Sequence, residues 1–150
     1  MRKEEVLLKS MINKYYLSIF IFISIFMVGS CPAYSEKIAL DSMSIAKDID
    51  NVYVHKLSSD KNSTDFLIVI KKSVPLHMHA NHTETIYVLD GEGEFQENNE
   101  RYMIKKGDYL RIKKGAPHAV KVTSINPLKV LSVQAPEFFG KDRIFLPKKE

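Results

Sequence analysis

The chain has 150 residues, which is enough for one ordinary domain and not for two. The formal net charge is +4. Four basic and two acidic residues among the first 31 contribute half of this positive charge, and the rest of the chain has 18 basic and 16 acidic residues. A nearly neutral domain argues against a function that depends on binding a polyanion, so we expect no nucleic-acid partner.

The N-terminal segment has the layout of an export signal. Basic residues precede the apolar run Leu17–Val28, and the small residues Gly29 and Ser30 follow it. The run of twelve residues is short for a membrane span, which needs about 20, although the uncharged stretch extends over Tyr15–Ser35. We expect residues 1–35 to be a signal peptide, a lipoprotein signal or an uncleaved anchor. Each alternative places the domain in the periplasm, in the cell envelope or outside the cell, because Lys and Arg residues that flank an apolar segment stay on the cytoplasmic side of the membrane.

Cys31 is the only cysteine, so an internal disulfide is excluded. The run Val28-Gly29-Ser30-Cys31 resembles the bacterial lipobox, with Val28 where Leu is usual, and acyl chains on Cys31 would hold the protein at a membrane surface. The alternative is cleavage after Ser35, which would remove Cys31 with the signal. We favour lipidation and expect membrane contact only through this N-terminal segment.

The remaining chain, residues 36–150, is predicted to be one domain with a core at about residues 52–134. Residues 36–50 predict an entry segment with one short helix or an edge strand. Eight or nine short strands follow, in runs rich in β-branched and aromatic residues separated by turn signals. These runs are Asn51–Leu57, Asp65–Lys71, Val74–His79, Glu84–Leu89, Gly93–Glu97, Arg101–Ile104, Tyr109–Ile112, Ala119–Thr123 and Leu128–Gln134.

This pattern indicates an all-β sandwich or barrel, because no amphipathic helix of ordinary length follows the N-terminal segment. Asn98-Asn99 suits a tight hairpin turn, and Gly91, Gly107 and Gly115 are expected at sharp reversals of the chain. The tail, residues 135–150, is expected to lie along the outside of the barrel.

Four residues predict a metal site. His77 and His79 are two apart in a predicted strand, so both imidazoles face the same side, and Glu84 opens the next strand after a short loop. Two imidazoles and a carboxylate on one face suit Fe(II), while Mn, Ni, Zn and Cu also occupy such sites. His118, at the start of a later strand, could complete the shell. The resulting net positive charge favours a carboxylate, enolate or catecholate ligand.

Other polar residues have weaker patterns. His82 lies in the predicted loop between two strands, where a solvent-exposed histidine is more common than a ligand. Strand phase alone does not decide whether Tyr53 and Gln134 line the pocket.

The spacing resembles that of the cupins. Their first motif is Gly, five residues, His-x-His, three or four residues, Glu, six residues and Gly, and here only the leading Gly is replaced, by Lys71. Gly107, Gly115 and His118 are in register with the second motif, in which Lys113 replaces Pro and Val122 replaces Asn. The resemblance covers roughly residues 52–134. It implies a jelly-roll barrel, one divalent metal held by the four predicted ligands, and a homodimer.

Cupins have many functions, so the fold alone does not define this one. The first hypothesis is a metalloenzyme of the dioxygenase, decarboxylase or isomerase type that acts on a small organic molecule. The second is a non-catalytic envelope module that binds a small ligand or a sugar, because the sequence offers no evident general acid or base outside the ligand set. A metal-free barrel that serves only in dimerisation is a weaker third hypothesis. No catalytic residue is assigned.

Overall fold

The computed structural model describes Leu7, Lys9, Met11, Lys14, residues 34–43 and residues 48–147. The chain divides into two units, Met1–Ile38 and Ala39–Glu150. In the first unit, the four isolated residues are helical and residues 34–38 have no regular structure. The predicted apolar run and Cys31 lie outside the described residues. Within the described part of the chain, no helix has the length and the apolar character that crossing a membrane requires.

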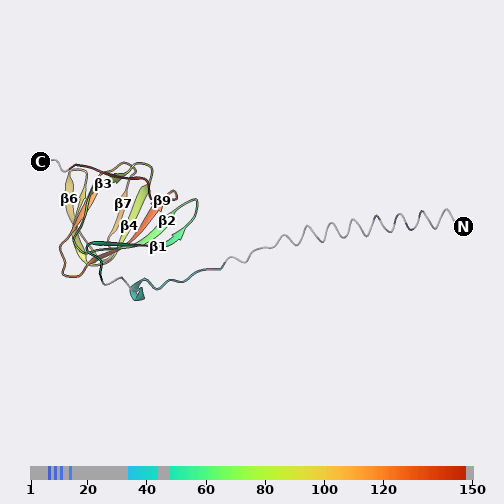
Figure 1. The fold of residues 1–150 in the computed structure, drawn as a ribbon, viewed down its shortest axis with the longest axis horizontal. Helices are drawn as coiled ribbons and strands as arrows, with labels where there is room; N and C mark the ends of the chain where they lie inside the picture. The colour runs from blue at the N-terminus through green and yellow to red at the C-terminus, as the bar shows by residue number, and fades with distance from the viewer. Residues whose placement is uncertain are drawn as a thin grey trace. The chain divides into compact units, whose positions relative to one another are not determined.

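The second unit is all-β, as predicted, and each expected run forms a strand (Figure 1). In the described residues that precede the strands, one 3-10 turn is present, η1 (Leu40–Ser42). The strands are β1 (Val52–Ser59), β2 (Thr64–Ile70), β3 (Ser73–His79), β4 (Thr83–Asp90), β5 (Glu92–Glu97), β6 (Glu100–Lys105), β7 (Tyr109–Ile112), β8 (His118–Val122), β9 (Leu128–Ala135) and β10 (Arg143–Phe145).

The strands form two five-stranded antiparallel sheets. One has the order β1-β2-β9-β4-β7 and the other the order β10-β3-β8-β5-β6. Non-polar side chains of both sheets face each other and form the core, because alternate residues of a strand point to the same face. Its buried members are Ile68, Ile70, Ile86, Val88, Phe95, Ile104, Leu110, Ile112, Val120, Leu128 and Val130. This arrangement is the predicted jelly roll.

Two turns set the geometry of the central strands. β5 and β6 form a hairpin in which Glu97 pairs with Glu100, and Asn98 in the turn has a φ of 54°. Gly91 joins β4 to β5 with a φ of 78°, and a Cβ there would lie 2.6 Å from the carbonyl oxygen of Pro127. This position therefore requires glycine for both conformation and space. Gly107 and Gly115 also have positive φ, 95° and 77°.

The tail differs from the prediction. Arg143–Phe145 forms β10 and pairs antiparallel with β3, with Arg143 opposite His79 and Phe145 opposite His77. The expectation that the tail runs along the outside is therefore wrong for these three residues. So short a strand has no periodicity to detect, and it forms because the edge of β3 offers unpaired backbone groups.

Candidate metal centre

The four predicted ligands come from both sheets. His77 and His79 lie at the end of β3, and His118 begins β8, where its Cα is paired with that of His77. Glu84 is the second residue of β4, in the opposite sheet, and pairs with Gln134 of β9. The site therefore lies between the two sheets, inside the barrel.

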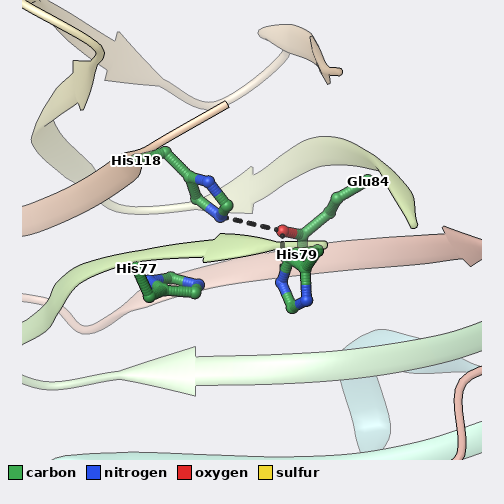
Figure 2. Close-up of side chains that lie close together, drawn as sticks. All are labelled: His77, His79, Glu84 and His118. Atoms are coloured by element: carbon green, nitrogen blue, oxygen red, sulfur yellow. Dashed lines mark hydrogen bonds and ion pairs between the residues drawn. The ribbon is translucent and has the colours of Figure 1, made fainter. Parts of the chain in front are cut away.

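These side chains converge on one point. One ligand atom from each of the four residues lies within 4.8 Å of the others, and all four residues are buried. Oε2 of Glu84 lies 3.2 Å from Nε2 of His118 and 3.5 Å from Nε2 of His79 (Figure 2). Ligands of a transition metal at about 2.1 Å lie roughly 3.0–3.5 Å from their neighbours around the ion. The observed spacing fits a single ion.

Backbone carbonyls orient two of the imidazoles. Nδ1 of His77 is 2.8 Å from the carbonyl oxygen of Pro75, and Nδ1 of His118 is 3.0 Å from that of Ala116. A carbonyl can only accept, so each Nδ1 donates, and Nε2 is the atom whose lone pair would bind an ion in the neutral imidazole. This is the tautomer that a metal ligand needs when the outer nitrogen is fixed by a hydrogen bond.

Protonation at neutral pH also suits a metal. Burial, and then the charge of nearby His118, lowers the pKa of His77 from 6.5 to about 4, so its imidazole is neutral. Burial acts to raise the pKa of Glu84, but hydrogen bonds from His118, His79 and Ser132 outweigh it and hold that pKa well below its ordinary range. A buried carboxylate needs a compensating positive charge, which a divalent ion would provide.

Ser132 positions the Glu84 carboxylate. Its hydroxyl, fully buried on β9, donates to Oε1 of Glu84 over 2.5 Å. Oε1 is thereby engaged, while Oε2 faces the imidazoles. The sequence did not point to Ser132, because its partner is 48 residues away on another strand.

His79 has incomplete hydrogen bonding. Among the described residues, its Nδ1 and Oε1 of Gln134 are buried and lack a hydrogen-bond partner. Nε2 of Gln134 lies 3.5 Å from Nε2 of His79, so Gln134 borders the site. Asp142 Oδ2 lies 4.0 Å from Nδ1 of His79, close to the position of the outer carboxylate that often accompanies a ligating histidine. The hydroxyl of Tyr53 instead lies 3.5 Å from Nδ1 of His55, and Tyr53 does not line the cavity next to the cluster.

His82 is not the exposed loop histidine that was predicted. It is buried, its Nδ1 is hydrogen-bonded to Asp142, and its Nε2 lies 2.9 Å from the carbonyl oxygen of Glu137. The prediction was wrong because the covering residues come from the C-terminal tail, about 60 positions away. His82 is not part of the four-residue cluster.

A cavity of about 230 Å³ adjoins the cluster, between the two sheets. Twelve of its sixteen lining residues are apolar, and they come from strands of both sheets. The four others are His77, Glu84, His118 and Arg143. Arg143 and Phe145 of β10 are exposed, so they lie where the cavity meets solvent.

Comparisons with known proteins match this chain to one family. The Cupin_2 family model, described as a cupin domain, matches residues 66–134. An uncharacterized protein of Aquifex aeolicus is 36% identical over 96 residues, which cover 64% of this chain and 78% of that protein. A double-stranded β-helix protein of Klebsiella pneumoniae, solved by crystallography, is 19% identical with a TM-score of 0.66, over 77% of this chain and all of that one.

Two relatives carry functional names. A quercetin 2,3-dioxygenase of Bacillus subtilis is 44% identical over 50 residues, which are 33% of this chain and 15% of that enzyme. An oxalate-binding protein of Thermotoga maritima is 38% identical over 61 residues, which are 41% of this chain and 50% of that protein. Both matches span half or less of the relative.

Proposed function

This chain belongs to the cupin superfamily, and on that basis we propose that it binds one divalent metal ion and acts on a small organic molecule as a metalloenzyme. His77, His79, Glu84 and His118 would hold the ion. The observation that carries the proposal is the convergence of four buried ligand atoms within 4.8 Å, from three strands and both sheets.

The surroundings of the four residues support the proposal. Three imidazoles and one carboxylate form a donor set that suits Fe, Mn, Ni, Zn or Cu. A bound ion would act as a Lewis acid toward an oxygen atom of the ligand. Pro75, Ala116 and Ser132 orient the donors, and the apolar cavity walls exclude water from the ligand.

The donor set also bears on the reaction class. Dioxygenation, decarboxylation and isomerisation all suit such a centre, and one relative is named as a dioxygenase. A non-catalytic binding module is the second candidate. It is favoured by the cavity lining, in which the described residues include no titratable side chain besides His77, Glu84, His118 and Arg143, and by the relative named as an oxalate-binding protein.

Metal content tests the first part of the proposal. We expect about one equivalent of metal in protein purified anaerobically, measured by mass spectrometry after reconstitution with each candidate ion. His118→Gln should lower metal affinity by more than the roughly 10–100-fold typical of outer-shell changes. His55→Gln is the matched control, since His55 is a half-buried strand histidine outside the cluster. Absence of stoichiometric metal under every condition would contradict the metal site.

Turnover separates enzyme from binding module. Oxygen uptake and product formation would be measured on the metal-loaded protein with diols, keto acids and thiols. Metal-dependent turnover that His118→Gln abolishes supports the enzyme. Stoichiometric ligand binding without turnover supports the binding module.

We also propose that the domain, residues 36–150, works outside the cytoplasm, in the periplasm or cell envelope or as a secreted protein. The basic and apolar N-terminal pattern and the lipobox-like run before Cys31 support this location.

A further inference from the structure

The cavity beside the donor cluster is lined mainly by apolar side chains. Where the structure describes the chain, no Ser, Thr, Asn, Gln or Tyr side chain lines it. Its walls are instead built from residues such as Val54, Ile68, Ile86 and Phe95. Hydroxyl groups of a ligand would lose water here and find no partner, which weakens binding. The body of a well-matched ligand is therefore apolar.

The cavity volume limits the size of that body. An apolar cavity of about 150 Å³ holds one benzene molecule. The volume of about 230 Å³ leaves room for a six-membered ring with a short substituent. A large polycyclic ligand would not be enclosed.

The charges at one end of the cavity select an anion. Of the described residues, Glu84 is the only acidic one that lines it, and a divalent ion held by Glu84 and neutral imidazoles would leave a net positive charge. Arg143 adds a second positive charge. In the described part of the chain, no carboxylate lies within 4.0 Å of the Arg143 guanidinium as an ion-pair partner.

The pairing of β10 with β3 directs Arg143 toward the site. Arg143 and Phe145 are two apart, so their side chains share a face of the sheet, and their Cα partners are His79 and His77. Both residues line the cavity, and the Phe145 ring centroid lies 6.0 Å from that of His77. The charge of Arg143 also acts on His77, where it favours the neutral imidazole.

We propose that this cavity binds a small monocarboxylate with a compact apolar body, and that Arg143 is the residue that selects the carboxylate. The apolar body fills the space between the sheets, and the carboxylate lies between the donor cluster and the guanidinium. A guanidinium suits this task because it binds a carboxylate through two parallel hydrogen bonds. This inference rests on the proposed metal site, which supplies the other positive charge.

The test uses the full chain, loaded with metal and with its metal content measured first. Binding of four probes would be measured by titration calorimetry: benzoate, benzyl alcohol, oxalate and glucose. Benzoate should bind at least about ten times more tightly than each of the others, because only benzoate combines the apolar body with one carboxylate. Equal or tighter binding of benzyl alcohol, oxalate or glucose overturns the proposal.

Variants test the role of Arg143. Arg143→Gln should weaken benzoate binding roughly 10–100-fold, the contribution of a hydrogen bond to a charged group, and should change benzyl alcohol binding less than about twofold. Arg143→Lys should be intermediate, since it keeps the charge and loses the planar fork. Arg101→Gln is the matched control, because Arg101 is exposed and its guanidinium is paired with Glu94 at 3.0 Å, away from the cavity.

The outcomes distinguish the two proposals. Full metal content without selective benzoate binding, or an unchanged affinity in Arg143→Gln, overturns the ligand inference and leaves the metal site standing. Failure to bind metal overturns the proposed function and, with it, this inference.

Discussion

The buried His82 and Asp142 are joined by a hydrogen bond between Nδ1 and Oδ2, across 60 residues of sequence. Asp142 also accepts from the backbone N–H of Asn81, at 2.9 and 3.0 Å to its two oxygens. The carboxylate thereby ties the loop that separates His79 from Glu84 to the segment before β10. The pair therefore supports the loop between two of the donors without belonging to the donor cluster.

Asp142→Asn is expected to weaken both metal binding and folding. The substitution keeps the shape of the side chain but removes its charge. In the native protein, burial acts to raise the pKa of Asp142, but the hydrogen bonds from His82 and Asn81 outweigh it and hold that pKa below its ordinary value. We expect a loss of roughly 10–100-fold in metal affinity, measured by chelator competition, and about 1–3 kcal/mol in the free energy of unfolding. Asp65→Asn is the control, because that carboxylate bonds only exposed Ser58 in the described structure. Unchanged metal affinity in folded Asp142→Asn would show that the pair is only structural.

Ser132→Ala should remove the hydrogen bond that orients the Glu84 carboxylate. Loss of the 2.5 Å hydrogen bond leaves Oε1 of the buried carboxylate without its hydroxyl donor, so the pKa of Glu84 should rise. We expect a decrease of about 1–2 kcal/mol in stability and of roughly tenfold in metal affinity, measured by denaturant unfolding and chelator competition. Ser58→Ala, at an exposed hydroxyl, should change neither quantity appreciably. A wild-type metal affinity in Ser132→Ala would contradict the role of Ser132 in orienting Glu84.

The free energy of unfolding of the metal-free protein should decrease as the pH is lowered from about 6.5 to about 4. Burial is the main reason that the pKa of His77 drops from 6.5 to about 4 in the folded state. Between these values the unfolded chain binds a proton at His77 and the native protein does not, so the free energy of unfolding decreases as the pH falls. The full loss is up to about 3 kcal/mol, at about 1.4 kcal/mol per pKa unit.

Denaturant unfolding of the metal-free protein at several pH values measures this loss. His77→Gln should flatten the curve between about pH 6.5 and 4.5. Below about pH 4.5 the lowered pKa of Glu84 contributes in the same direction, because its stabilisation is lost as the carboxylate is protonated. An equal slope in wild type and His77→Gln above pH 4.5 would assign the effect to another group.

Two glycines should differ in their tolerance of alanine. Gly91→Ala introduces a Cβ 2.6 Å from a backbone oxygen and also requires a positive φ, so we expect a loss of more than about 2 kcal/mol. Gly107→Ala also requires a residue with a Cβ to adopt a positive φ, of 95°, but nothing lies within 4 Å of the added atom. Its cost should stay near 1–2 kcal/mol, roughly the backbone strain alone. Thermal unfolding of both variants measures the difference, and equal losses would remove the steric explanation.

Cys31 tests the N-terminal prediction. If Cys31 is lipidated, labelled fatty acid should be incorporated into the full-length protein in a bacterial host, and Cys31→Ser should abolish it. Membrane fractionation should then show a shift of the variant from the membrane to the soluble fraction, because the acyl chains provide the attachment. Label that persists in Cys31→Ser would exclude lipidation at this residue.

Local sequence determined much of this protein. The alternating apolar runs predicted the all-β unit and each of the strands from β1 to β9, because inward-facing residues recur with the period of two that a strand imposes. The spacing of His77, His79, Glu84 and His118 predicted which side chains gather. His77 and His79 share a strand face, and Glu84 and His118 each lie near the start of a later strand. Such patterns are readable because they depend on neighbours in sequence.

Only the tertiary structure decided what surrounds the four donors. Two features of these surroundings join residues far apart in sequence: His82 is buried against Asp142, 60 positions away, and Ser132 contacts Glu84, 48 positions away. The third, the position of Arg143 over the cavity, depends on the three-residue strand β10. No local periodicity encodes these pairings, because they arise from which free strand edge and which buried polar group the tail meets in the folded domain. The ligand atoms could therefore be identified from the sequence, whereas the shape and charge of the cavity they face could not.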